Sequence, residues 1–376
     1  MRRVAFVLLA LLLLIQISPS TAAEKTSNSW SVKQKIVYVG LTPADDPTFW
    51  TGAPAVSSEA EPVIGAEQFV KEAVTNTMNF WIKNSAGKMK FAAPKFYFGK
   101  PGTALKRCNG SADIKSGMKV AGITKIPVGT HLVVANVNDS CGYAGLGAQG
   151  GNTINLKSLS SSTLAHELGH NFGFRHSSAV YCEKSNYSIF NASNCKVDEY
   201  GDFRDLMGND EWCPDATLSA AQRATVFYTP IAKDAKVGVE LNIDESQIKS
   251  DNIIYQLKYK NNWYFFEYFN PSSDRCMTVS GIAYEPQLQV RVIGPSWALS
   301  SGMAVGPTLI MREYLDLPEG NIKFERNGVP VSIPSDGWTL TGFFTGEKFK
   351  LPGTPYVLSV KSTDPTSAVF TISAFS

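Results

Sequence analysis

The sequence HELGHNFGFRH occupies residues 166–176. His166 and His170 are four positions apart, so on a helix both imidazoles lie on one face, a single turn apart, and can bind the same ion. Glu167 follows the first histidine and points away from that face, beside the ion. This position suits a general base for a water molecule that the ion activates. The spacing therefore predicts a helix that carries two metal ligands and a catalytic base.

The second half of this motif supplies a turn and a third ligand. Gly173 comes three residues after His170, where the helix must end, and glycine adopts the left-handed conformation that a sharp turn requires. His176 can then approach the ion from outside the helix. Three neutral histidines with an open fourth position form a catalytic zinc site, with Zn–N distances of about 2.0–2.1 Å. We therefore predict one catalytic Zn2+ bound by His166, His170 and His176, with Glu167 as the base.

The motif HExxHxxGxxH resembles the extended zinc motif of the metzincin peptidases. A second segment, EYGDFRDLMG at residues 199–208, resembles their Met-turn, and Met207 matches the methionine that lies beneath the zinc-bound histidines. The YGD and DLMG elements, together with HNFG, are similar to the gametolysin-like branch, in which a glycine-rich AGLG segment also precedes the zinc helix. The specific resemblance covers about residues 142–208 and, more loosely, residues 34–230.

This resemblance implies an α+β catalytic domain with a mixed sheet, a zinc-binding active-site helix and a Met-turn. It also implies a zinc-dependent endopeptidase whose protein or peptide substrate binds in extended form along the glycine-rich segment, through main-chain hydrogen bonds. Two positions depart from the family. Some metzincins carry a tyrosine two residues after the methionine, where this chain has Asn209. A cysteine switch is also missing, since Cys108 lies too deep in the expected domain to belong to a pro-segment.

Two alternative interpretations of the metal motif remain open. In one class of HExxH enzymes the third ligand is a downstream glutamate, and Glu183 and Glu199 follow His170 by 13 and 29 residues. In the other alternative, the chain is a secreted, zinc-stabilised binding protein with little or no turnover. Glu167 argues against the binding protein, because a purely structural site has no use for an ionisable group beside the ion.

Three other polar residues have structural explanations. His131 opens an apolar run, and we expect a hydrogen-bonded structural side chain there. Asp202 and Asp205, near the expected Met-turn, could bind calcium. However, two carboxylates are too few for a calcium cage, and turn hydrogen bonds explain them equally well. A calcium ion is therefore possible but unsupported.

Residues 1–23 are typical of a secretory signal peptide, with Arg2 and Arg3 before an apolar run and small residues at its end. The formal net charge of the chain is +2, so its remaining 353 residues carry a net charge of 0. This balance gives no electrostatic reason to expect nucleic acid or an anionic membrane as a partner, and no second apolar segment suggests a membrane anchor. We expect a secreted, extracellular protein, or a periplasmic or cell-surface one in a bacterium. The sequence does not indicate an oligomeric state.

Six cysteines in an exported chain suggest disulfide bonds. Cys182 and Cys195 flank a 12-residue polar segment just after the metal motif. Closing a loop of this size stabilises a fold by about 3 kcal/mol in the chain-entropy model. We predict Cys182–Cys195 and Cys108–Cys141, which leaves Cys213–Cys276 to tie the two expected domains together.

The order of apolar patterns predicts a mixed domain followed by a β-rich one. Within residues 24–232, strands are expected at 34–41, 91–98 and 131–137, with helices at 66–84, after the hydroxyl-rich 160–163, and at 218–227. The glycine-rich segment 141–152 should be irregular or a bulged edge strand. From about residue 233, short β-rich runs alternate with turn residues, which predicts an all-β, sandwich-like domain over 233–376. Its aromatic cluster at 263–269 is more simply a core strand than a binding platform.

Overall fold

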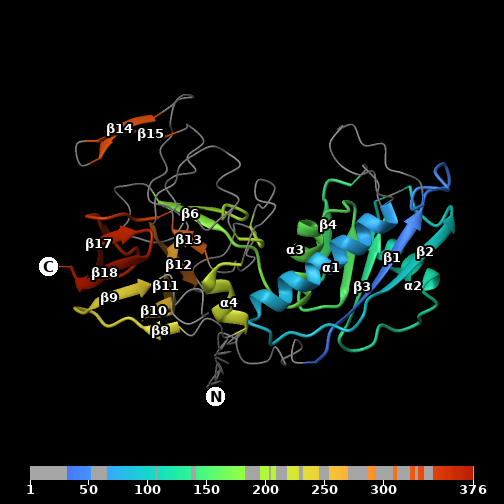
Figure 1. The fold of residues 1–376 in the computed structure, drawn as a ribbon, viewed down its shortest axis with the longest axis horizontal. Coiled ribbons are helices and arrows are strands. Elements are labelled where there is room, and N and C mark those ends of the chain that lie inside the picture. Colours follow the sequence, from blue (N-terminus) through green and yellow to red (C-terminus); the bar gives the residue numbers. More distant parts are fainter. Residues whose placement is uncertain are drawn as a thin grey trace, which may run out of the picture.

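A five-stranded mixed sheet forms the centre of the N-terminal part in the computed structural model (Figure 1). The order is β2-β1-β3-β5-β4, with the first four strands parallel and β4 antiparallel to β5. The strands are β1 (Lys35–Thr42), β2 (Lys95–Pro101), β3 (Thr130–Ala135), β4 (Gly145–Gly147) and β5 (Thr153–Leu156). β4 lies at the edge of the sheet, as the glycine-rich sequence predicted.

The structure describes residues 32–51, 66–106, 108–136, 141–182, 195–202, 205–208, 218–227, 232–244, 254–269, 287–293, 308–310, 322–326, 329–333 and 342–375. The expected signal peptide, Glu183, Asn209, Cys213 and Cys276 lie outside these residues. Among the described residues, no helix combines the length and the apolar character that crossing a bilayer requires.

Helices cover both faces of this sheet. α1 (Ala66–Asn84) and α3 (Ser161–Asn171) pack on one face, where Ile36 and Val133 share a core with Trp81 of α1. α2 (Gly110–Val120) packs on the other face, against alternate residues such as Val37 and Val134. Because successive side chains of a strand point to opposite faces, the continuous apolar runs of β1 and β3 can serve both cores.

The sequence predicted α1 with the bounds that the structure has, and predicted α3 and the start of β1 closely. It did not predict α2, whose glycines at 110 and 117 weaken the helical pattern. Gly117 allows close contact with the sheet, because a Cβ at this position would lie 2.4 Å from the Val134 side chain. The Cys108–Cys141 disulfide lies just before α2 and has its Cα atoms 5.3 Å apart, which confirms that predicted pair.

Two further sheets pack against each other in the C-terminal part. A seven-stranded sheet has the order β7-β6-β13-β12-β11-β10-β8, and a four-stranded sheet has the order β16-β17-β18-β9. They share one core, to which Phe266 and Val290 contribute from the first sheet, and Leu358 and Phe370 from the second. This arrangement is compatible with the predicted β-rich region. A separate two-stranded sheet is formed by β14 (Ile322–Arg326) and β15 (Val329–Ile333).

The strands of these two sheets have the following bounds: β6 (Ala179–Cys182), β7 (Cys195–Asp198), β8 (Ala232–Asp234), β9 (Glu240–Asp244), β10 (Ile254–Tyr259), β11 (Asn262–Phe269), β12 (Gln287–Ile293), β13 (Thr308–Ile310), β16 (Lys348–Lys350), β17 (Tyr356–Asp364) and β18 (Ser367–Ala374). β6 pairs with β13 in parallel, so residues on both sides of the expected boundary at 232/233 contribute to the seven-stranded sheet. α4 (Ala220–Phe227) packs against β11 of this sheet.

The aromatic cluster of β11 belongs mainly to the core. Tyr264, Phe265, Phe266 and Tyr268 are all buried, so the core interpretation of this cluster is confirmed for these four residues. The Tyr264 hydroxyl donates a hydrogen bond to the Pro352 carbonyl at 2.6 Å, which satisfies its polar end inside the core.

Candidate metal centre

The helix that carries the motif begins and ends as its sequence requires. Ser160 caps α3, and its side chain accepts a hydrogen bond from the Thr163 amide at 3.0 Å. At the other end, Gly173 has a φ of +96°, a left-handed conformation that costs glycine little. The Phe174 amide donates to the Gly169 carbonyl and the Gly173 amide donates to the His170 carbonyl, which is the pattern of a Schellman motif. The predicted turn at Gly173 is confirmed.

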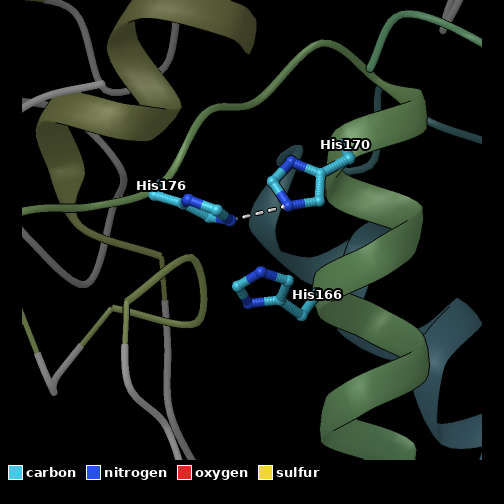
Figure 2. Close-up of side chains that lie close together, drawn as sticks. All are labelled: His166, His170 and His176. Carbon is cyan, nitrogen blue, oxygen red and sulfur yellow. Dashed lines mark hydrogen bonds between the residues drawn. The ribbon is translucent and has the colours of Figure 1, made fainter. Parts of the chain in front are cut away.

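This turn brings the three predicted histidines together. His166 and His170 extend from α3, and His176 approaches from the segment after the turn (Figure 2). One ring nitrogen from each histidine lies within 4.8 Å of the other two, and Nε2 of His170 and Nε2 of His176 are 3.0 Å apart. Tetrahedral bonds of about 2.0–2.1 Å would place such nitrogens about 3.4 Å apart. The three histidines could therefore hold a metal ion.

The other ring nitrogen of each histidine contacts an oxygen that can only accept a hydrogen bond. Nδ1 of His166 donates to the Leu206 carbonyl at 2.7 Å, and Nδ1 of His170 donates to the Phe174 carbonyl at 3.0 Å. Nδ1 of His176 donates to Oε1 of Glu199 at 2.6 Å. Because Nδ1 then carries the proton in each neutral ring, all three Nε2 atoms present lone pairs. Three converging lone pairs repel one another and form a favourable arrangement only around a cation.

Burial favours the neutral form of these histidines. It lowers the pKa of His166 to about 3, assisted by the neighbouring charges of His170 and His176 when these are protonated. Burial also lowers the pKa of His170 to about 4 and the pKa of His176 below its usual value, although the Glu199 carboxylate acts in the opposite direction on both. At neutral pH the three rings are therefore uncharged, which is the form that binds metal.

Glu199 contacts the outer side of the histidine cluster. Its carboxylate bonds to Nδ1 of His176, on the opposite side of the ring from Nε2, and it does not belong to the group of converging ligand atoms. Of the two glutamates considered as a third ligand, Glu199 thus orients His176 instead of replacing it. A carboxylate in this place fixes the ring and raises the basicity of the ligand. The sequence motif alone did not assign this role.

Glu167 lies between α3 and the edge strand β4. It is only 7% exposed, and its Oε2 accepts a hydrogen bond from the Gly147 amide at 2.5 Å. A Cβ at residue 145 would lie 2.5 Å from Cγ of Glu167, and a Cβ at residue 147 would lie 2.3 Å from the Glu167 carbonyl. Glycine is therefore required at both positions for β4 to approach the helix this closely.

Met207 lies beneath the helix, as the resemblance implies. It is fully buried, and a Cβ at Gly169 of α3 would lie 2.5 Å from its sulfur. Asp205 holds the turn through hydrogen bonds from the Met207 amide to Oδ1 at 2.8 Å and from the Ser219 amide to Oδ2 at 2.7 Å. Burial, followed by the charge of Asp202, raises the pKa of Asp205. Both aspartates considered for calcium are thus buried and bonded to protein groups.

Tyr200 is a neighbour of the cluster that sequence reasoning missed. Its ring centroid lies 4.1 Å from that of His176 and 6.3 Å from that of His166. Burial, followed by the carboxylates of Glu199 and Glu167, raises the pKa of Tyr200 to about 12, so its hydroxyl keeps its proton at neutral pH. Tyr200 belongs to the second motif, but its place in that sequence gave no signal that its ring would lie beside His176.

The remaining predicted residues lie elsewhere. His131 is buried, with its Nε2 2.8 Å from Oε1 of Gln34, so its structural role is confirmed. The backbones of β6 and β7 pair Cys182 with Cys195. The third predicted disulfide lies outside the described residues.

No protein-family model matches the chain, and a search of curated proteins finds no relative.

Proposed function

We propose that this chain is a secreted, zinc-dependent endopeptidase. The observation that carries the proposal is the orientation of His166, His170 and His176. Each Nδ1 donates to a fixed oxygen, so three Nε2 lone pairs converge on one point. Three imidazole ligands suit zinc and leave its fourth position open, which distinguishes a catalytic site from a closed structural one. The resemblance of residues 166–176 and 199–208 to the metzincin motifs supports the same assignment.

When bound, zinc would act as a Lewis acid that polarises the peptide carbonyl and activates water. Glu167 would take the proton from the attacking water and return it to the leaving amine. The hydrogen bond from the Gly147 amide holds one carboxylate oxygen of Glu167, which restricts the side chain to one orientation. Glu167 is also next in sequence to the ligand His166, which favours it over other carboxylates for this role.

The edge strand β4 supports binding of an extended peptide. β4 is the last strand of its sheet and pairs with β5 along one of its two edges. The side chain of Leu146 in β4 is 57% exposed. A peptide that adds to such an edge is held by main-chain hydrogen bonds, which depend little on its sequence. Since Gly147 also contacts Glu167, a peptide along β4 would pass beside the catalytic base.

The proposal is tested with the purified secreted chain and a mixture of unfolded proteins. Cleavage sites are identified by mass spectrometry in the presence of zinc, after chelation, and after zinc is restored. The proposal expects new internal termini that disappear with the chelator and return with zinc. Zinc binding without any cleavage would instead favour the zinc-stabilised binding protein, and cleavage that resists complete chelation would contradict a zinc mechanism.

A further inference from the structure

A buried ion-pair cluster joins the C-terminal strands to the segment around the histidines. Arg291 of β12 is 2% exposed, and its Nε and Nη2 donate to Oδ2 of Asp202 at 3.0 and 2.8 Å. Nη1 of the same guanidinium lies 3.0 Å from Oε2 of Glu267 on β11. One arginine from the C-terminal sheet thus bridges two buried carboxylates, one on each side of the expected domain boundary.

Asp202 connects this arginine to two of the histidines. Its Oδ2 also accepts a hydrogen bond from the Ser177 hydroxyl at 3.1 Å, and Ser177 directly follows His176. The Ser177 amide donates to the Met207 carbonyl at 2.7 Å, next to the Leu206 carbonyl that orients His166. The position of the Asp202 carboxylate therefore affects both the chain at His176 and the turn that holds His166.

Glu267 provides a second connection to the same segment. Its Oε2 and Oε1 accept hydrogen bonds from the amides of Ala220 and Ala221 at 3.0 and 2.7 Å, at the N-terminus of α4. A carboxylate is favourable there because it satisfies helix amides that have no partner within the helix. The same helix also contacts the chain beside the histidines. Nε2 of Gln222, in the first turn of α4, donates a hydrogen bond to the carbonyl of Arg175 at 3.1 Å, and Arg175 directly precedes His176.

We propose that Arg291 is a positioning residue of the metal centre, so that β11 and β12 are required for the site to form. This inference rests on the metal centre of the proposed function. Removing the arginine would leave the buried carboxylates of Asp202 and Glu267 without their shared cation, a strongly unfavourable state. These carboxylates would then shift toward water and carry the segment from Arg175 to Ser177 with them. A lysine cannot replace the arginine fully, because its single ammonium lacks the planar fork that donates twice to Asp202 while a third nitrogen lies beside Glu267.

The test measures metal binding by full-length Arg291→Met and Arg291→Lys variants under conditions in which circular dichroism shows them folded. Zinc affinity is determined by competition with a chromophoric chelator, and the visible spectrum of the Co2+-substituted protein reports ligand geometry. We expect the Met variant to bind zinc about 10–100-fold more weakly, as for other residues that orient metal ligands. Its cobalt spectrum should change, and Arg291→Lys should recover part of the loss.

Two control variants separate positioning from general stability. Lys157→Met breaks the buried ion pair with Asp113, whose atoms are 2.7 Å apart, and should lower stability without changing zinc affinity. Lys361→Met breaks an exposed ion pair with Glu240 and should change neither.

A folded Arg291→Met variant with wild-type zinc affinity and cobalt spectrum would overturn the inference and leave the proposed function intact. If the Met variant does not fold, Arg291→Lys decides the matter, since wild-type zinc affinity and spectrum in that variant would show that Arg291 serves stability alone. A wild-type chain that binds no zinc would remove both proposals.

Discussion

Nδ1 of His176 donates a hydrogen bond to the Glu199 carboxylate at 2.6 Å, so a residue 23 positions further along the chain orients the third histidine of the cluster. The carboxylate fixes the ring and increases the electron density on Nε2. The Glu199→Gln variant keeps an oxygen acceptor but loses the charge. We expect it to retain one zinc per chain at saturation, with an affinity about tenfold weaker.

Zinc titration of Glu199→Gln beside His176→Ala checks this prediction. His176→Ala removes a ligand and should lose affinity more severely. If Glu199→Gln lost zinc and His176→Ala kept it, Glu199 would be the ligand, and the glutamate-ligand class would replace the present assignment.

The stability of the metal-free protein should fall as the pH decreases from 7 to 4. The folded-state pKa values of His131 and His170 are lowered to about 4 and that of His166 to about 3, so the unfolded chain binds protons that the folded chain does not. Stability rises with pH wherever the unfolded state binds more protons. Each such histidine contributes a slope of about 1.4 kcal/mol per pH unit below its unfolded pKa of about 6.5.

Urea unfolding of the chelator-treated protein at several pH values measures this slope. The matched variant His170→Asn has one fewer of these histidines, so its unfolding free energy should change less between pH 6.5 and 4. Equal slopes in the two proteins would contradict the account of His170 as a half-buried, neutral imidazole.

Gly147→Ala should disturb the contact between β4 and α3. The added Cβ would lie 2.3 Å from the Glu167 carbonyl, so the strand and helix must separate, which would weaken the bond from the Gly147 amide to Glu167. Overpacking of this kind costs about 1–3 kcal/mol. Gly142→Ala is the control, because a Cβ there meets nothing within 4 Å. Thermal unfolding and peptide hydrolysis of both variants test the prediction, and equal effects would refute it.

The predicted Cys182–Cys195 disulfide agrees with the backbone pairing of β6 and β7, which places the two residues opposite each other. Directly opposed residues in an antiparallel pair have Cα atoms about 4.5–5.5 Å apart, a separation that a disulfide can span. Peptide mapping without reduction should find these two cysteines in one linked peptide. Finding either of them free or joined to another cysteine would refute the pairing.

The sequence predicted the parts of the site that depend on local spacing. His166, His170 and Gly173 follow from the geometry of one helix and its end, and His176 follows from the turn. Glu199 was considered as a ligand, but its role depends on which ring nitrogen it faces. Arg291 gave no signal, because its partner Asp202 is 89 positions away and the pairing depends on a contact between distant segments of the chain.

The fold likewise has parts that local patterns in the sequence predict and parts that depend on contacts between distant segments. α1 follows from its apolar periodicity, and its predicted bounds agree with the structure. The membership of β6 and β7 in the seven-stranded sheet depends on the parallel pairing of β6 with β13. Such a contact between distant segments leaves no periodic pattern in either of them.

The most direct test of the account is the Glu167→Gln variant, assayed with the wild-type chain on an unfolded protein such as casein. The substitution keeps the shape of the side chain and removes the base, so zinc content and thermal stability should stay near wild type. Hydrolysis should fall by at least about 10²–10⁴-fold, the contribution typical of a general acid–base catalyst. Equal hydrolysis by the two proteins at equal zinc content would contradict the assignment of Glu167 as the catalytic base.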